Sequence, residues 1–308
     1  MNINKLVVGL LSVGFCCGCF AGEAVSGPNG KVDFSTGNMD GNSGNNFMGS
    51  FAFPLGTNFG FQVDALFTDV ADRDFYGTGA HLFWRDSEKG FFGIVAGGVH
   101  EEYLESWAGG LEGELYLGDF TLGAQGGVAN MDYDLGALPF FNTDQTEYYA
   151  IADVGFYPTD NLLLSLSHTR AFGNGMTQAQ VEYQTPLAGV SLFADVGQGE
   201  YNYDHALVGI RYYFGAKEKS LKCRHRQDDP QNMLNAILYN VGTSSAEFGS
   251  KMEEFYRRLF DDSLRSGGGS FGAIGGSFGA IGGSGGSSWS SDRFSDTFSV
   301  DSDIIAIP

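Results

Sequence analysis

The chain has 308 residues, a formal net charge of −20 and 47 glycines. Its length suffices for a barrel of up to about 250 residues plus an appendage, and its glycine content is about twice the average share. A chain this acidic lacks the basic surface that nucleic-acid-binding proteins need, so we do not expect nucleic acid among its partners.

The first residues have the pattern of a secretory signal peptide. Lys5 supplies the positive charge, and residues 6–17 form an apolar stretch that is too short to span a membrane as a helix. We expect a signal peptide over residues 1–21, because Ala21 fits the small-residue rule for cleavage; cleavage after Ala24 is the alternative. No later stretch is long and apolar enough for a transmembrane helix, so a membrane location requires a barrel.

Twelve short segments of alternating character follow, and they predict an all-β, up-and-down antiparallel barrel. Twelve is even, as in bacterial outer-membrane barrels with both ends in the periplasm. The expected strands are 31–37, 47–53, 59–68, 76–85, 91–100, 106–117, 120–130, 147–157, 162–169, 177–185, 190–199 and 205–214.

The connections between these segments alternate short and long. The short set is rich in Pro, Gly, Asn and Asp, the residues of tight turns; it comprises 54–58, 86–90, 118–119, 158–161 and 186–189. The long set comprises 38–46, 69–75, 101–105, 131–146, 170–176 and 200–204. In outer-membrane barrels short turns are periplasmic and long loops extracellular. The long loops are acidic, so they either hold divalent ions that bridge lipopolysaccharide phosphates or form a plain solvated surface.

A period of two places alternate side chains on opposite faces of each strand. Leu111 and Leu115 share one face, for example, while Glu112 and Glu114 share the other. A soluble barrel would bury the apolar face, whereas a membrane barrel turns it to lipid. The signal peptide, the aromatic residues near strand ends and the small polar residues on the second face favour the membrane alternative.

The last strand carries a resemblance to a known family. Residues 208–214 resemble the assembly signal of Gram-negative outer-membrane β-barrel proteins, in which a glycine precedes aromatics by three and five residues; Gly209, Tyr212 and Phe214 fit this pattern. Leu207 departs from it, and the chain continues far beyond Phe214. The resemblance covers about 31–214 and implies a proteobacterial member of the porin-like superfamily, located in the outer membrane. Its implied partners are outer-membrane lipids, lipopolysaccharide and the barrel assembly machinery, and it transfers no activity.

The composition changes after Gly215. A basic cluster, two expected helices near 229–238 and 246–264, and a capping box formed by Ser244 and Glu247 predict a basic, helical periplasmic extension over 216–265. Residues 266–308 are expected to be a Gly/Ser-rich flexible tail. The basic cluster is predicted to bind anionic lipid or peptidoglycan, or only to orient the last strand; it comprises Lys217, Lys219, Lys222, Arg224 and Arg226.

Strand parity also selects charged residues for the inner face. The candidate pore-lining residues are Asp64, Glu112, Glu114, Asp153, Glu182, Asp195 and Arg211. An acid-rich lumen favours cations, so a narrow porin-like channel for passive diffusion of small neutral or cationic solutes is the main hypothesis. The alternative is a non-conducting structural or surface-interaction barrel with a filled interior. Twelve strands allow either, and the open pore is favoured.

An outer-membrane lipid hydrolase is the third hypothesis. Ser167 and His168 are adjacent in a strand, so they point to opposite faces and cannot pair; His168 with Ser165 or Ser191 stays open. The five histidines show no metal-ligand spacing. We therefore expect no enzyme activity, no catalytic residues, no metal and no cofactor.

Overall fold

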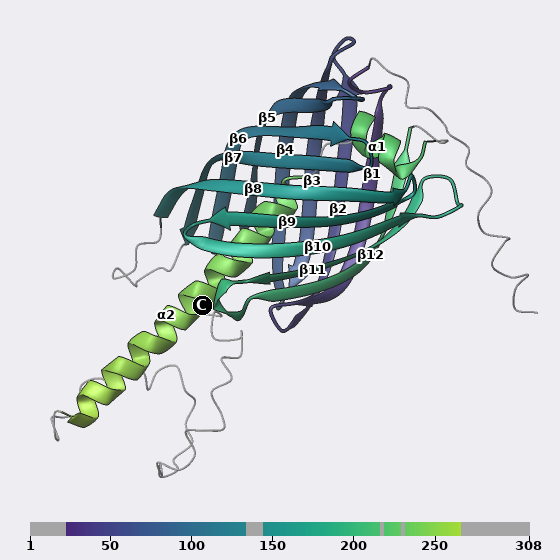
Figure 1. The fold of residues 1–308 in the computed structure, drawn as a ribbon. Coiled ribbons are helices and arrows are strands. Elements are labelled where there is room, and N and C mark those ends of the chain that lie inside the picture. The colour runs from purple at the N-terminus through teal and green to yellow at the C-terminus, as the bar shows by residue number, and fades with distance from the viewer. Residues whose placement is uncertain (1–22, 134–143, 216–218, 229–231, 266–308) are drawn as a thin grey trace, which may run out of the picture.

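The computed structural model describes residues 23–133, 144–215, 219–228 and 232–265. Twelve antiparallel strands form one closed barrel, in which each strand pairs with its neighbours in sequence and β1 pairs with β12 (Figure 1). The expected all-β, up-and-down barrel is therefore confirmed. The strands are β1 (Asn29–Met39), β2 (Asn42–Pro54), β3 (Phe59–Val70), β4 (Arg73–Asp86), β5 (Gly90–Glu101), β6 (Leu104–Leu117), β7 (Phe120–Tyr133), β8 (Asp144–Thr159), β9 (Leu162–Ala171), β10 (Asn174–Gln184), β11 (Val190–Gly199) and β12 (Asp204–Phe214).

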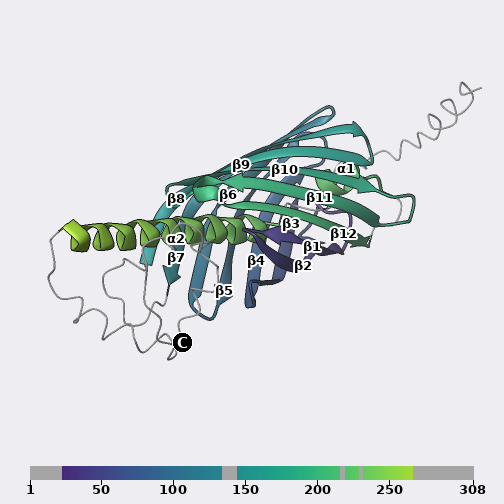
Figure 2. The ribbon, with the colours of Figure 1, turned by 90° about the horizontal axis from the view of Figure 1, so that it is seen from below.

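Two helices follow the barrel and distinguish its two ends. We call the end where β1 begins and β12 ends the α1 end, because α1 (Leu221–Gln227) lies there (Figure 1). The other is the α2 end, because α2 (Leu234–Arg265) leaves the barrel there (Figure 2). A 3-10 turn, η3 (Glu200–Asn202), also lies at the α2 end, between β11 and β12.

The expected alternation of short and long connections is wrong. The strands continue through most stretches that looked like loops at the α2 end, because their polar residues extend the backbone ladder past the apolar band. Asp40-Gly41, Ala71-Asp72 and Phe172-Gly173 are two-residue connections with positive φ at both positions. This conformation is typical of tight hairpins. The longest connection between the strands is 134–143, which does join β7 and β8 at the α2 end.

The outer face of the barrel is apolar. Exposed aliphatic side chains form its middle, among them Val63, Leu82, Ile94, Leu111, Leu122, Leu166, Val208 and Ile210. Exposed aromatic rings lie towards the α1 end (Phe59, Trp84, Phe120, Tyr212) and towards the α2 end (Phe47, Phe67, Tyr76, Trp107, Tyr148). Such girdles are typical of outer-membrane barrels. Five other aromatic residues near strand ends are instead buried inside the barrel: Phe83, Phe91, Tyr116, Tyr149 and Tyr157.

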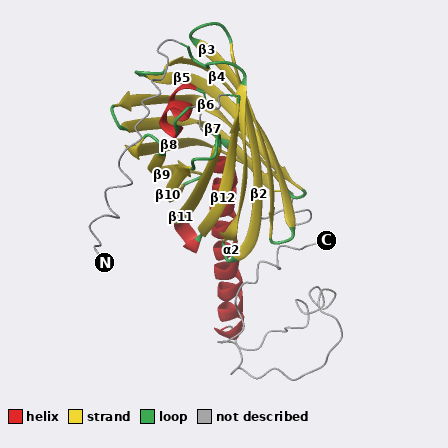
Figure 3. Ribbon diagram, turned by 90° about the vertical axis from the view of Figure 1, so that its right-hand side faces the viewer, coloured by secondary structure: helices red, strands yellow, loops and turns green. Residues whose placement is uncertain are grey.

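The segment 216–265 is not a separate periplasmic extension, because α1 and the first half of α2 lie inside the barrel (Figure 3). Residues 234–238 and 246–264 of the two expected helices belong to the single helix α2, and Ser244 lies within it and caps no helix. The physical reason is burial: Leu234 and Ile237 of the expected apolar face are covered by the barrel wall. Among the described residues, no helix is long and apolar enough to cross a membrane. The signal peptide and the tail 266–308 lie outside the described residues.

Candidate functional site: the barrel lumen

All seven candidate pore-lining residues face the lumen. Strand parity places them correctly because each occupies the position opposite an outward apolar residue, as Arg211 does between Ile210 and Tyr212. Asp64, Glu112, Glu182, Asp195 and Arg211 are buried. Glu114 and Asp153 line a cavity inside the barrel. Whether any of them lines a conducting pore stays a prediction.

Arg211 is at the centre of one ion-pair cluster, on the wall formed by β12, β1 and β10. Its Nε and Nη2 atoms donate to the Asp33 carboxylate at 2.7 and 2.9 Å, and its Nη1 atom donates to Glu182. The hydroxyl of Tyr213 donates to the second Glu182 oxygen at 3.0 Å. Asp33 was not among the residues predicted from the sequence, although its parity with Ser35 and its pairing opposite Arg211 follow from the register of β1 and β12.

His81 joins two further candidates. Its Nε2 atom lies 2.8 Å from Asp64 and its Nδ1 atom 2.9 Å from Glu112, and all three side chains are buried. Gln62 donates to the other Asp64 oxygen at 2.9 Å. Both ring nitrogens therefore face carboxylates, an arrangement that suits an imidazolium with two donors. His81 was assigned no role from the sequence, because it shares no recognisable spacing with its partners.

A third pair lies towards the α2 end. His205 Nε2 is 2.6 Å from Asp195, and the imidazole stacks on the ring of Tyr239 from α2, with centroids 4.1 Å apart. Gln178 donates to the second Asp195 oxygen. Most of the predicted lumen charges are thus paired within the barrel. Among the described residues, no group of three or more His, Cys, Asp or Glu side chains is placed to hold a metal.

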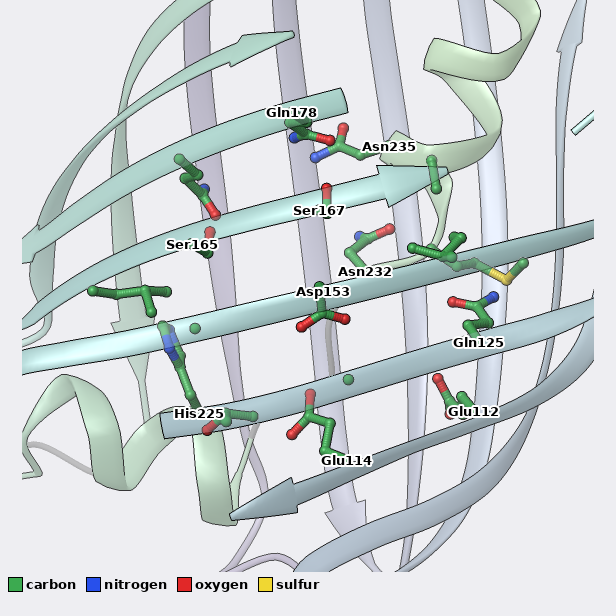
Figure 4. Close-up of a pocket in the computed structure, with 18 of the residues that line it drawn as sticks. Glu112, Glu114, Gln125, Asp153, Ser165, Ser167, Gln178, His225, Asn232 and Asn235 are labelled. Carbon is green, nitrogen blue, oxygen red and sulfur yellow. The ribbon is translucent and has the colours of Figure 1, made fainter. Parts of the chain in front are cut away.

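A polar cavity of about 170 Å³ remains between the wall and the helices. Figure 4 shows Glu114, Asp153, Ser165 and Ser167 on one side and Asn232, Asn235 and His225 among the residues from the helical segment. Most of the lining residues are polar, and Glu114 on β6 and Asp153 on β8 lie on either side of β7. A space of this size accommodates water and small polar species, so the helices narrow the lumen greatly without excluding solvent.

The wall near the α2 end is apolar, and α2 covers it. Leu66, Val95 and Val99 are at most 5% exposed and belong to one cluster with Leu234 and Ile237. The same cluster includes Met39, Met48, Leu104, Met131, Leu207, Met233, Leu238 and Val241. Glycines let the helix approach closely: a Cβ built at Gly97 would lie 3.1 Å from Met233 Sδ, and one at Gly242 only 2.5 Å from the Tyr203 ring.

The basic cluster of the sequence is used at the α1 end. Arg226 donates to the carbonyls of Gly118 and Phe120 at 2.9 and 2.7 Å, and its guanidinium lies over the rings of Tyr116 and Tyr157. Other basic residues bind nearby: Lys222 pairs with Asp119, Lys219 with Asp228, and Arg224 donates to Gln184. These contacts attach α1 to the barrel mouth. Binding to peptidoglycan or anionic lipid through this cluster stays a prediction.

The N-terminal residues also enter the lumen at the α1 end. Ala24 and Val25 are buried against Phe83 and Phe91. Arg85 lies over both of these rings, at 4.7 and 5.1 Å from their centroids, and donates to the Ala24 carbonyl at 3.4 Å. At this end the inward aromatic residues therefore contact Arg85 and Arg226 inside the barrel and do not face lipid.

The hydrolase candidates are not brought together. His168 is exposed on the outer face and contacts Thr177 at 3.0 Å, whereas Ser165 and Ser167 line the inner cavity and Ser191 is buried in the wall. In the assembly signal, Tyr212 faces outward and Phe214 stacks on Phe51. Gly209 leaves room for the Phe193 ring, whose nearest atom lies 2.4 Å from a built Cβ. The assembly role of these residues stays a prediction.

No protein-family model and no curated protein matches the sequence. Solved structures with a similar fold include a KdgM porin (10% identity, TM-score 0.44, 60% of this chain and 99% of that chain). A NanC porin is 7% identical, with a TM-score of 0.46 over 60% of this chain and 100% of that chain. The outer membrane protein Omp33 of Acinetobacter baumannii is 12% identical, with a TM-score of 0.40 over 64% and 100%. At these values the likeness says nothing about what this chain does.

The chain's own features place it in a membrane. In the closed ring each strand is hydrogen-bonded through its backbone to a strand on either side, so the sheet has no open edge. Its outer surface is apolar, with aromatic residues towards both ends. Its inner surface carries the ion pairs, a polarity opposite to that of a soluble barrel. In architecture the chain is therefore an outer-membrane β-barrel.

Proposed function

We propose that this protein is a porin-like channel held closed by its own C-terminal segment. When that segment is displaced, the acid-rich lumen passes small neutral or cationic solutes. The supporting observation is the cover that α2 gives to an apolar wall. In a water-filled pore, Leu66, Val95 and Val99 would expose apolar surface to water, which is unfavourable. Here they are buried because α2 packs on them.

The remaining cavity supports the solute class. It is lined by Glu112, Glu114, Asp153, Glu182 and Asp195, while Lys31, Arg211 and α1 supply positive charges. Displacement of the whole segment would take His225 and Arg226 away from the cavity, where the wall carboxylates outnumber Lys31 and Arg211. An acidic wall raises the local concentration of cations.

A second candidate is a non-conducting barrel that serves envelope structure or surface interaction. The same packing favours it, because each buried Leu or Ile of α2 contributes about 2 kcal/mol to keeping the helix in place. The two candidates differ in one respect: in the second, the helix never leaves the lumen.

Conductance of the purified full chain in a planar bilayer separates them. The Leu234→Asp/Ile237→Asp double variant places charges against the apolar wall and should expel α2. We expect few or no steps from the unmodified chain and larger, cation-selective steps from the variant. Ser250→Asp, at an exposed position of α2, is the matched control and should stay closed.

The outcome decides between the candidates. Equal conductance of the unmodified chain and the variant would show that α2 does not close the lumen. A variant that still runs as a folded, heat-modifiable barrel but stays silent would leave the non-conducting barrel. In an opened channel, Glu114→Gln/Asp153→Asn should weaken the cation preference, and unchanged selectivity would remove both residues from the pore.

A further inference from the structure

The C-terminal segment enters the barrel at one end and leaves it at the other. We propose that the barrel carries this segment through its own lumen and displays it, from about residue 246 onward, on the external face of the outer membrane. The inference does not depend on whether the lumen conducts. It assigns the barrel a further function, as the membrane anchor and passage for its own C-terminus.

The entry point is fixed by α1. The last strand ends at Phe214 at the α1 end, and α1 stays there: the Leu221 amide donates to Asn161, and Lys222 lies 2.8 Å from Asp119 in the β6–β7 turn. Asp228, just after α1, accepts hydrogen bonds from Ser26. The segment therefore begins its path at the α1 end, beside the start of β1 and the end of β12.

The contacts of the segment then advance steadily along the barrel. Asn232 donates to Ser50 near the middle of β2, and Leu234 lies against Gly79 in the middle of β4. Five residues later Tyr239 stacks on His205, near the α2 end of β12. Ser245 then meets Tyr133, the last residue of β7, and Glu247 accepts from Asn174, the first residue of β10. The order of these partners shows a helix that traverses the lumen.

The helix continues well beyond this rim. From Glu247 to Arg265 it adds 18 residues, about 27 Å at 1.5 Å per residue. Figure 2 shows this part of α2 projecting past the barrel. Ser250, Lys251, Glu254 and Arg257 are exposed along it, so it presents charged side chains suited to an aqueous compartment.

The α2 end is the external end. Because the number of strands is even, β1 begins and β12 ends on the same side of the membrane. For a chain exported through a signal peptide, that side is the periplasm. The longest connection between the strands, 134–143, also lies at the α2 end, and longer connections are extracellular in such barrels. This reverses the periplasmic location expected for the C-terminal segment from its sequence.

Epitope accessibility on intact Gram-negative cells tests the proposal with the full chain. One tag is inserted after Ser266, a second in the 134–143 connection, and a third between Leu187 and Ala188 in the β10–β11 turn at the α1 end. We expect antibody binding to the first two tags on intact cells, and to the third only after permeabilisation. Heat-modifiable migration on gels verifies that each tagged barrel is folded.

Two results would overturn the proposal. One is a Ser266 tag that binds antibody only after permeabilisation while the 134–143 tag binds on intact cells. The other is binding to the Leu187 tag on intact cells, which would reverse the barrel. Trypsin treatment of cells with the untagged chain gives a second readout: cleavage at Lys251 or Arg257 supports display, whereas cleavage at Lys89 alone refutes it.

Discussion

Arg211 satisfies two buried carboxylates at once, so its loss should be costly. It holds Asp33 through a bidentate pair and Glu182 through a third donor, and its own side chain is only 9% exposed. Arg211→Met would leave both carboxylates buried without their cation. Removal of one partner from a buried ion pair costs roughly 3–5 kcal/mol, and we expect a loss in that range from the free energy of unfolding in detergent.

Urea unfolding of the purified barrel measures this loss. Arg170→Met is the matched control, because Arg170 is exposed on the outer face of β9. Surface substitutions of this kind are usually within about 0.5 kcal/mol of neutral. Similar losses for both variants would mean that the Arg211 cluster contributes little beyond side-chain removal.

At the scale of single elements, α2 is fixed where it leaves the barrel by Glu247. Asn174 donates to its carboxylate at 2.7 Å, and Lys251 pairs with it one turn further along the helix. Burial by itself raises the pKa of Glu247, but the hydrogen bonds from Lys251 and Asn174 outweigh it and lower the pKa below the ordinary value of 4.5. A carboxyl with a lowered pKa stabilises the fold above its unfolded pKa.

This stabilisation is therefore present above about pH 4.5 and lost as the pH falls through the lower value of the folded state. Hydrogen exchange of the α2 amides around residue 247, corrected for intrinsic rates, should show weaker protection in acid than at neutral pH. Glu247→Gln should abolish this difference, while Glu254→Gln, further along the projecting helix, should retain it. A pH effect that survives Glu247→Gln would assign it to other groups.

Element by element, the sequence predicts the walls of this barrel better than its contents. Period-two alternation depends only on which side of a strand faces lipid, so it placed Glu112, Arg211 and the other candidates on the correct face. Turns such as Ala71-Asp72 and Phe172-Gly173 escaped notice because neither pair has the usual composition of a two-residue hairpin. The position of α2 inside the lumen was not predicted, because an apolar stripe on a helix does not indicate which surface it packs against. The available signal was Leu66, Val95 and Val99, which make their strands apolar on both faces at the α2 end.

At the scale of the whole molecule, lipid contact should depend on the outward face alone. Ile94 and Leu111 are paired neighbours in the middle of the outer surface, each 53% exposed. An arginine on the lipid face costs about 2–4 kcal/mol at the bilayer midplane. We therefore expect Ile94→Arg to destabilise the barrel by this amount in lipid vesicles.

Leu187→Arg provides the comparison. Leu187 is 68% exposed in the turn between β10 and β11, outside the strands, where the cost of a charge falls to about 0–1 kcal/mol. Reversible urea titration in vesicles gives both values. Equal destabilisation by the two variants would contradict a membrane-spanning outer face.

The pairing of β1 with β12 has a mechanical consequence. From Gly30↔Phe214 to Met39↔His205 the seam is fully laddered, so the ring around α2 has no free edge. The helix cannot depart sideways without unzipping a strand pair. It can leave only along the barrel axis, in the direction in which its side chains slide past the wall. A pull applied near Arg265 would then shear the side-chain contacts between α2 and the wall, while the hydrogen bonds of the ring stay intact. The β1–β12 pairing that closes the sheet therefore also retains α2 inside the barrel.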